Sequence, residues 1–387
     1  MINKDTTRMP VLPVSAYTSQ EWFDLEQKQI FSKVWTFVGF PEDLAETGDH
    51  ITVQAGLNNI LVIRGNDGVL RAFHNICRHR GARMLRPHGK SASAITCPYH
   101  DWTYDFEGNL RGIPNKADEF PDLDPACLGL HKASIALWRG MVFVHPSPNA
   151  PSIDEWFGPM EPYVGPHRPE QMMEIHEAAN ETEVKANWKF VAENYIDAYH
   201  LPLLHSGTLS MYDHRNAETG FVGDHFAFYE PLSPDYAENV EKNAPGPLVE
   251  FGTSHRLGAY VPLLFPGIGL SETETSWSVF HIVPLAPDKT LVRTRTKVPA
   301  ATEAAFAKAE RRSSSFWKNK IGPKYQGDPK TDPMASGDFM AEDVFACEQQ
   351  QASLTSPYFS VGASANIGEK PVRDYQKIIE RWMQQTG

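Results

Sequence analysis

Two cysteine–histidine pairs in residues 75–102, NICRHRGARMLRPHGKSASAITCPYHDW, have the residue types and spacing of metal ligands. Cys77 and His79 are separated by one residue and Cys97 and His100 by two, with seventeen residues between the pairs. A structural zinc site also uses thiolates and imidazoles, but its knuckles generally pair two cysteines or two histidines. One cysteine and one histidine from each half instead favour a [2Fe–2S] cluster, in which the cysteines bind one iron and the histidines the other. Because neutral imidazoles replace two thiolates, such a cluster accepts electrons more readily.

A second group of potential ligands lies in residues 187–207, NWKFVAENYIDAYHLPLLHSG. Asp197 and His200 are three residues apart, and we expect them to share a helical face, with Pro202 ending the helix before His205. Two histidines and one carboxylate form the facial triad of non-heme Fe(II) sites, which leaves positions open for dioxygen and substrate. Two histidines alone are equally typical of an ordinary polar helix end.

Residues 335–351, ASGDFMAEDVFACEQQQ, contain carboxylates that could complete such a triad. They are Asp338, Glu342, Asp343 and Glu348. On a helix, Gln350 would lie on the same face as Asp343 and could orient its carboxylate.

These candidate ligands fall in two regions of different pattern. Residues 50–145 alternate in short apolar and polar runs separated by turn signals, which predicts a small all-β domain. A proline-rich connector, residues 145–152, follows it. The rest mixes predicted helices (184–201, 302–318, 338–352 and 370–384) with strands (277–285 and 290–298), which indicates an α+β domain with an antiparallel sheet flanked by helices. A helix over 18–34, capped by Thr18, precedes both.

We therefore expect an α+β protein with an N-terminal helical segment, 1–34, packing on the catalytic domain, a cluster-binding domain, 35–148, and a mononuclear-iron catalytic domain, 149–387. A chain of 387 residues is long enough for two cores.

The composition restricts partners and location. A net charge of −12, from 36 basic and 48 acidic residues, argues against nucleic acid and anionic membranes, so a small-molecule substrate is expected. No run of about 18 apolar residues and no secretory signal is present, which predicts a cytoplasmic protein. Four cysteines are too few for a disulfide scaffold, and we expect Cys127 and Cys347 to be buried thiols.

The region between Cys77 and His100 is basic, unlike the chain as a whole. It contains Arg78, Arg80, Arg83, Arg86 and Lys90 and no acidic residue. These cations either form a solvated loop that lowers the electrostatic cost of the cluster, or steer an acidic electron donor to it.

The pattern C-x-H-x17-C-x2-H, within CRHRGA and CPYHDW, resembles the Rieske domain of the ring-hydroxylating and demethylating oxygenase family. Respiratory Rieske proteins have an additional disulfide cysteine in each loop, where this chain has Ala82 and Tyr99. The segment ENYIDAYHLPLLH is similar to that family's catalytic motif. The resemblance implies that His200 and His205 bind iron and that Asp343 is the third ligand. It also implies that Asp197 bridges the iron site to the Rieske histidine of a neighbouring subunit.

The same resemblance implies a terminal oxygenase with a [2Fe–2S] Rieske cluster, mononuclear Fe(II) and O2 as co-substrate. NAD(P)H would supply electrons through a separate reductase, with or without a ferredoxin, and the bridging role of Asp197 implies a homotrimer. The short chain favours a subunit that works without a small β partner.

Residues 201–270 are expected to contribute much of the substrate pocket, and their apolar side chains could equally belong to the core; they include Leu204, Phe226, Leu263, Leu264 and Phe265. Two substrate classes remain open. One is an aromatic carboxylate, which would place the enzyme in aromatic hydrocarbon catabolism. The other is a quaternary or methylated amine, which would bind in an aromatic cage if Tyr195, Tyr199, Tyr212, Tyr260 and Trp277 converge. A non-catalytic electron-transfer protein and a zinc-stabilised binding protein are the alternatives from other classes.

Overall fold

The computed structural model describes residues 10–243, 249–299, 304 and 325–384, which form two compact units. One unit spans Leu25–Gly158, and the other combines the chain before Leu25 with the chain after Gly158.

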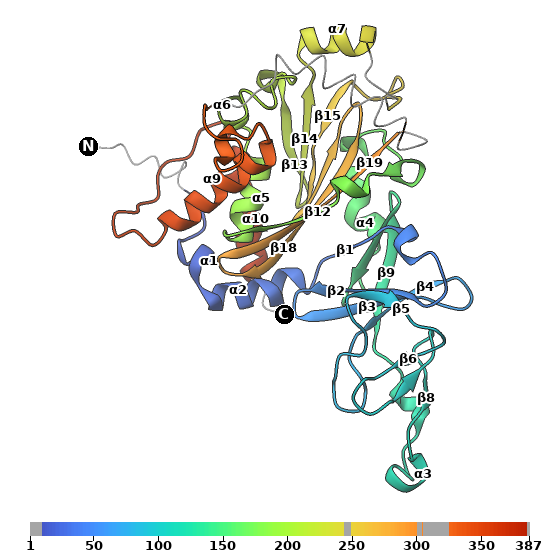
Figure 1. Cartoon of the computed structure of the whole chain (residues 1–387). Coiled ribbons are helices and arrows are strands. Elements are labelled where there is room, and N and C mark those ends of the chain that lie inside the picture. Colours follow the sequence, from blue (N-terminus) through green and yellow to red (C-terminus); the bar gives the residue numbers. More distant parts are fainter. Residues whose placement is uncertain (1–9, 244–248, 300–303, 305–324, 385–387) are drawn as a thin grey trace. The chain divides into compact units, whose positions relative to one another are not determined.

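The Leu25–Gly158 unit consists mainly of antiparallel strands, as the alternating pattern predicts (Figure 1). Its main sheet has the order β1-β10-β9-β4-β3-β2-β5, and a smaller sheet has the order β6-β7-β8. The strands are β1 Thr36–Gly39, β2 Asp49–Ala55, β3 Asn58–Arg64, β4 Leu70–His74, β5 His88–Lys90, β6 Ile95–Thr96, β7 Thr103–Tyr104, β8 Leu110–Gly112, β9 Lys132–Trp138 and β10 Met141–His145. Two short helices, α3 Lys116–Glu119 and α4 Ile153–Phe157, complete the unit.

The second unit is organised around an antiparallel sheet of nine strands, which confirms the predicted α+β class. Its order is β11-β19-β18-β17-β15-β14-β13, with β12 paired to β19 and β16 paired to β14 and β17. The strands are β11 Met173–Glu174, β12 Asn180–Val184, β13 Glu218–Val222, β14 His225–Pro231, β15 Gly258–Tyr260, β16 Leu263–Leu264, β17 Ile268–Glu272, β18 Trp277–Ala286 and β19 Lys289–Val298.

Helices α5 Trp188–Ile196, α9 Phe339–Ser353 and α10 Lys370–Gln384 contact strands of this sheet (Figure 1). The unit also contains α1 Ser15–Thr18, α6 Leu201–Leu204 and α7 Pro234–Asn243, and α2 Gln20–Glu26 spans the division between the two units. Apolar side chains of α5 and α9 join Phe280 and Val292 of the sheet in one core cluster. In the N-terminal segment, Tyr17 stacks on Phe190 of α5 with ring centroids 4.5 Å apart. Helices α5 and α9 are thereby packed against one face of the sheet.

Several predicted helices differ from the observed ones. The predicted helix 18–34 is divided into α1, α2 and a π-helical turn, Gln27–Phe31, and Ser19, not Thr18, accepts a hydrogen bond from the Trp22 N–H. The predicted helix 184–201 ends at Ile196. The predicted helix 302–318 lies outside the described residues, apart from residue 304.

Cys347 is buried as predicted, but Cys127 is exposed, so that prediction was wrong. Cys127 lies within the short 3₁₀ turn Pro125–Leu128, which has no buried residue.

Candidate metal centres

The two cysteine–histidine pairs lie in loops with the same backbone hydrogen bonds. In the first loop the Cys77 N–H donates to the Ala82 carbonyl and the Gly81 N–H donates to the Cys77 carbonyl. The second loop has the same two bonds. The Cys97 N–H donates to the Trp102 carbonyl, and the Asp101 N–H donates to the Cys97 carbonyl. The fourth residue after each cysteine, Gly81 or Asp101, has a positive φ, 76° or 54°. Both loops are therefore closed turns that present a cysteine and a histidine from one short segment.

The side chains of these loops converge within the core of their unit. Cys77 and Cys97 are buried, and the rings of His79 and His100 have centroids 4.7 Å apart. The His79 ring stacks on Trp102 at 4.9 Å, which fixes its orientation. Nδ1 of His100 is buried and has no hydrogen-bond partner among the described residues. A buried nitrogen without a partner costs free energy unless it binds something, and a metal ion meets that need.

The donor set fits a [2Fe–2S] cluster. Burial raises the pKa of the Cys97 thiol, so a thiolate in this position needs a compensating positive charge, which iron provides. The hydroxyl of Tyr104 lies 3.5 Å from the Cys77 sulfur and accepts a hydrogen bond from the Arg78 N–H. That hydroxyl is therefore placed to tune the cluster through its sulfur ligand.

The basic residues of this region have different environments. Arg78 is half-buried and donates to the Gly129 carbonyl, whereas Lys90 pairs with Glu46. Arg80, Arg83 and Arg86 are exposed, and the guanidinium of Arg80 also lies 5.4 Å from the ring centroid of Tyr99. Three of the five cations between Cys77 and His100 are thus exposed on the surface.

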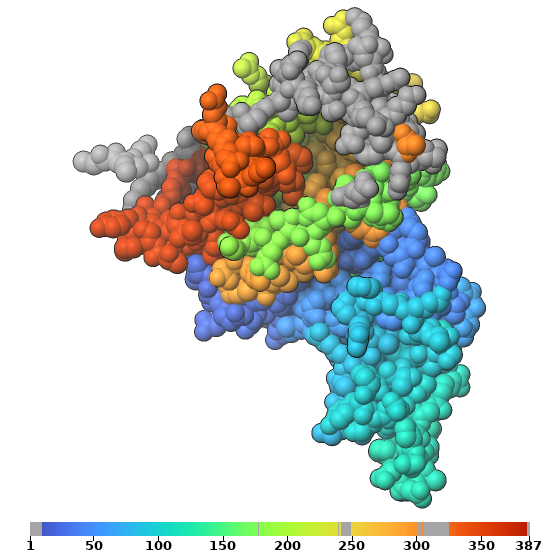
Figure 2. Space-filling view, viewed as in Figure 1, coloured from blue at the N-terminus to red at the C-terminus, as the bar shows by residue number. Residues whose placement is uncertain are grey.

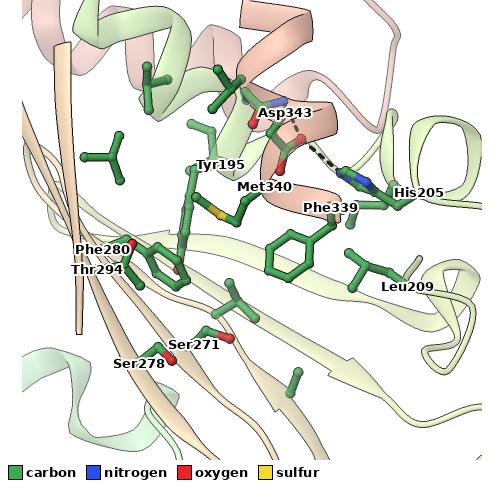
Figure 3. A pocket seen from close by; sticks show the side chains of 18 of the residues that line it. Tyr195, His205, Leu209, Ser271, Ser278, Phe280, Thr294, Phe339, Met340 and Asp343 are labelled. Carbon is green, nitrogen blue, oxygen red and sulfur yellow. Dashed lines mark hydrogen bonds and ion pairs between the residues drawn. The ribbon is translucent and has the colours of Figure 1, made fainter. Parts of the chain in front are cut away.

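In the catalytic unit, His200, His205 and Asp343 come together. Each offers one ligand atom, and these atoms all lie within 4.8 Å of one another. Nε2 of His205 lies 2.9 Å, and Nε2 of His200 3.6 Å, from Oδ1 of Asp343. His205 and Asp343 are linked at the upper right of Figure 3. No other group of this kind occurs in the described ranges.

The local structure around the histidines differs from the prediction. Helix α5 ends at Ile196, so Asp197 is its C-cap in an extended conformation and does not share a helical face with His200. His200 precedes α6, and Pro202 lies in the first turn of α6 instead of ending a helix. Proline is tolerated there because the first N–H groups of a helix need no partner within it.

Three polar side chains contact the triad. Oε2 of buried Glu342 lies 2.7 Å from Nδ1 of His205, and Oδ2 of Asp197 lies 3.2 Å from Nδ1 of His200. The Asn194 amide donates to Oδ1 of Asp343 at 3.1 Å. Each histidine thus has its Nδ1 beside one carboxylate and its Nε2 toward Asp343.

Burial by itself would lower the pKa of His205, but the Asp343 and Glu342 carboxylates outweigh burial and raise it. The sequence suggested Gln350 as the residue that orients Asp343, but Gln350 is exposed and the amide that donates to Asp343 is that of Asn194. The role of Glu342 was also missed, although its position directly before Asp343 could have indicated it.

The other carboxylates of that segment have structural contacts. Asp338 caps α9 through the Met340 N–H, and Glu348 accepts from the Lys185 N–H. Asp343 is thus the candidate that lies beside both histidines.

A cavity of about 520 Å³ adjoins the triad. Figure 2 shows a hollow between the orange-red C-terminal part and the green segment near residues 178–184, both of which line the cavity. Its helical side includes Tyr195, Leu209, Phe339 and Met340, whereas the sheet side includes serine and threonine hydroxyls (Figure 3).

The predicted pocket residues were partly wrong. Phe226, Leu263, Leu264 and Phe265 are buried core residues that do not line the cavity, and Leu204 does not line it either. Of the possible aromatic cage, Tyr195 and Tyr212 line the cavity, but Tyr199, Trp277 and Tyr260 do not.

Comparison with known families agrees with this arrangement. The family described as "Ring hydroxylating alpha subunit (catalytic domain)" matches residues 170–385, and the "Rieske [2Fe-2S] domain" matches residues 34–128. The chain belongs to the ring-hydroxylating oxygenase alpha-subunit family and is a Rieske-type oxygenase. Its cofactors are accordingly a [2Fe–2S] cluster and a mononuclear iron, with O2 as co-substrate.

Individual relatives cover different parts of the chain. The glycine betaine monooxygenase oxygenase subunit of Chromohalobacter salexigens is 29% identical over 73% of this chain and 70% of its own length. The carnitine monooxygenase oxygenase subunit of Escherichia coli is 34% identical over 51% of this chain and 52% of its own, so that match spans about half of each. The crystal structure of the quaternary ammonium Rieske monooxygenase CntA has the same fold, with a TM-score of 0.74 at 22% identity, covering 96% of this chain and 95% of that one.

None of the helices in the described part of the chain is long and apolar enough to span a membrane.

Proposed function

We propose that this chain is the terminal oxygenase of a system that oxidises a quaternary or methylated amine at an N-methyl group. The resulting hemiaminal would lose formaldehyde, so the overall reaction is a demethylation. The proposal takes one of the two substrate classes that the sequence predicts, and it rests on the cavity lining together with the amine-oxidising relatives.

The residues that line the cavity support this proposal. Five aromatic side chains are among them: Tyr195, Tyr212, Phe228, Phe280 and Phe339. The faces of aromatic rings attract quaternary ammonium groups. No lysine or arginine is present among the described lining residues. An aromatic carboxylate would therefore have no lysine or arginine to pair with in the described lining. A substrate cation needs no such partner.

In this proposal His200, His205 and Asp343 hold the catalytic iron, and Cys77, His79, Cys97 and His100 hold the cluster. The bound iron supplies the activation of dioxygen.

The protein side chains around the iron perform separate tasks. Glu342 is hydrogen-bonded to Nδ1 of His205, and Asp197 lies 3.2 Å from Nδ1 of His200, so that each Nε2 is presented to the metal. The Asn194 amide holds Oδ1 of Asp343. The apolar side chains of Leu209, Phe339 and Met340 limit access of water to the reacting methyl group.

Asp197 is also the proposed contact between subunits. Its Oδ1 accepts a hydrogen bond from the Tyr199 N–H at 2.7 Å, which holds the carboxylate in the turn after α5. We propose a homotrimer in which Asp197 also reaches His100 of a neighbouring copy. A separate reductase, with or without a ferredoxin, would deliver electrons from NAD(P)H, guided by the exposed arginines of the Rieske loops.

The test is a substrate panel with the purified chain, a reductase and NADH. Glycine betaine, carnitine and choline would represent methylated amines, and benzoate would represent aromatic acids. Formaldehyde released in proportion to oxygen consumed, from at least one amine, is the expected result. A hydroxylated aromatic acid without formaldehyde from any amine would contradict the proposal.

A further inference from the structure

The sheet side of the cavity contains a buried carboxylate that no role in iron binding explains. Glu230 is on β14, is 4% exposed and lines the cavity. The triad, in contrast, comes from α9 and the segment that follows α5.

Strand register places Glu230 on the cavity face. Residues two apart on a strand point to the same face about 7 Å apart, and both Phe228 and Glu230 line the cavity. Glu230 pairs with Ala259 of β15, and Tyr260, the next residue, pairs with Glu272 of β17. The antiparallel register therefore brings Thr273 beside Ala259. Glu230, Ala259 and Thr273 form one end of the cavity wall.

The hydrogen bonding of Glu230 is incomplete. Its Oε1 lies 2.5 Å from Nδ1 of His214, which is its hydrogen-bond partner in the described ranges. A carboxylate has about four acceptor positions, so most of those on Glu230 remain for a ligand. His214 is not a lining residue, so Glu230 presents the charge at this end of the cavity.

The other carboxylates of the lining are already engaged. Asp197 and Asp343 contact the two histidines, and Asp338 is exposed and caps α9. Glu230 is the remaining acidic side chain in the described lining, and the hydroxyls beside it, such as Thr273, can complete a polar subsite.

We propose that Glu230 determines the charge specificity of the cavity by binding a positively charged substrate and rejecting one that carries a carboxylate. This inference rests on the proposed function and narrows it. A buried carboxylate gains from a nearby cation and is destabilised by a second carboxylate. The preferred substrate is accordingly a methylated amine without a carboxylate, which would separate this chain from enzymes for betaine or carnitine.

The experiment compares two probes of nearly equal shape on the full-length holoenzyme. Choline carries a quaternary nitrogen, and 3,3-dimethylbutan-1-ol has carbon in its place. Calorimetric titration should show that the unchanged protein prefers choline. Glu230→Gln keeps an oxygen acceptor for His214 but removes the charge, so choline affinity should fall about tenfold or more while that for the alcohol stays the same. Glycine betaine, which carries a carboxylate in addition to the quaternary nitrogen, should bind more tightly to Glu230→Gln than to the unchanged protein.

The matched control is Glu272→Gln. Glu272 is a buried carboxylate of β17 whose neighbours Ser271 and Thr273 line the cavity, so its own side chain faces away. This variant should retain the choline preference. Thermal unfolding reports whether each variant folds. Thr273→Lys provides a second approach that retains Glu230, since a cation at this position should also weaken choline binding.

The outcomes separate this inference from the proposed function. Equal choline affinity in Glu230→Gln and the unchanged protein, with demethylation of an amine intact, would overturn the role of Glu230 alone. Choline binding that depends on Glu230, with no amine oxidised in the substrate panel, would retain the subsite and reject the demethylation. Failure of the unchanged protein to prefer choline over the alcohol would overturn the inference directly.

Discussion

Replacing Glu342 by glutamine tests whether the triad depends on its supporting carboxylate. Glu342 is fully buried, and its Oε2 lies 2.7 Å from Nδ1 of His205 and 2.8 Å from Oγ1 of Thr208. Both hydrogen bonds go to the same oxygen, so a glutamine oxygen in that position can still accept them, with the NH2 group in the place of Oε1, which has no hydrogen-bond partner among the described residues. The negative charge beside Nδ1 of His205 is lost, however, and the hydrogen bond that orients the imidazole is weakened.

The expected magnitude follows from these contacts. A hydrogen bond to a charged group contributes about 1.5–3 kcal/mol and one to a neutral group about 0.5–1.5 kcal/mol, so the change of acceptor removes about 1–1.5 kcal/mol. That is about tenfold, because a tenfold change is about 1.4 kcal/mol, and it lies at the lower end of the 10–100-fold that loss of a supporting contact to a metal ligand generally costs. We expect Glu342→Gln to weaken Fe(II) binding by about tenfold.

The assay is anaerobic titration of Fe(II) into protein stripped of its mononuclear iron, in competition with a chelator. Mildly alkaline pH limits competition from protonation of His205. Glu348→Gln is the control, because Glu348 is on the same helix but accepts from the Lys185 N–H. The signal of the reduced cluster should be the same in all three proteins. Unchanged Fe(II) affinity in Glu342→Gln, or equal losses in both variants, would refute the reasoning.

Three further predictions concern other parts of the chain. Asp197→Ala should retain cluster and iron but lose nearly all turnover; normal turnover would rule out the proposed bridge. Tyr104→Phe removes a hydroxyl beside the Cys77 sulfur, and a hydrogen bond of about 1 kcal/mol corresponds to a potential about 40 mV lower; an unchanged potential in voltammetry would mean that this contact does not reach the cluster. Burial raises the pKa of Glu193 to about 7 from an ordinary value of 4.5, so the folded protein binds this proton more tightly than the unfolded chain. The free energy of unfolding should therefore fall by about 3 kcal/mol as pH rises through that interval, and Glu193→Gln should remove this slope in denaturant titrations.

The sequence predicted the two architectures because their signals are local. Alternating runs and turn residues indicated the β domain, and the bounds predicted for β18, β19, α9 and α10 lie close to those observed. The metal-ligand candidates were found because soft ligands at unusual spacing are rare. Asp343 was a choice among four carboxylates that composition could not separate, and its proximity to His205 depends on the packing of α9 beside α5.

Other features depended on tertiary contacts that no local pattern encodes. Pro202 has the same sequence signature whether it ends one helix or begins the next. Glu342 and Glu230 are ordinary glutamates in the sequence, and their roles are visible only once burial removes them from water. The apolar residues Phe226 and Leu263 were expected in the pocket but lie in the core, because hydrophobicity does not distinguish a cavity wall from a packed interior.

The most direct test of the account is the content of iron and acid-labile sulfide per chain in anaerobically purified protein, with electron paramagnetic resonance of the reduced sample. A cluster held by Cys77, His79, Cys97 and His100 and an iron held by His200, His205 and Asp343 predict about three irons and about two sulfides, with a Rieske-type signal. His205→Ala should reduce this to about two irons and leave the signal intact. Zinc without sulfide, or loss of the cluster signal in His205→Ala, would contradict the assignment of two separate metal centres.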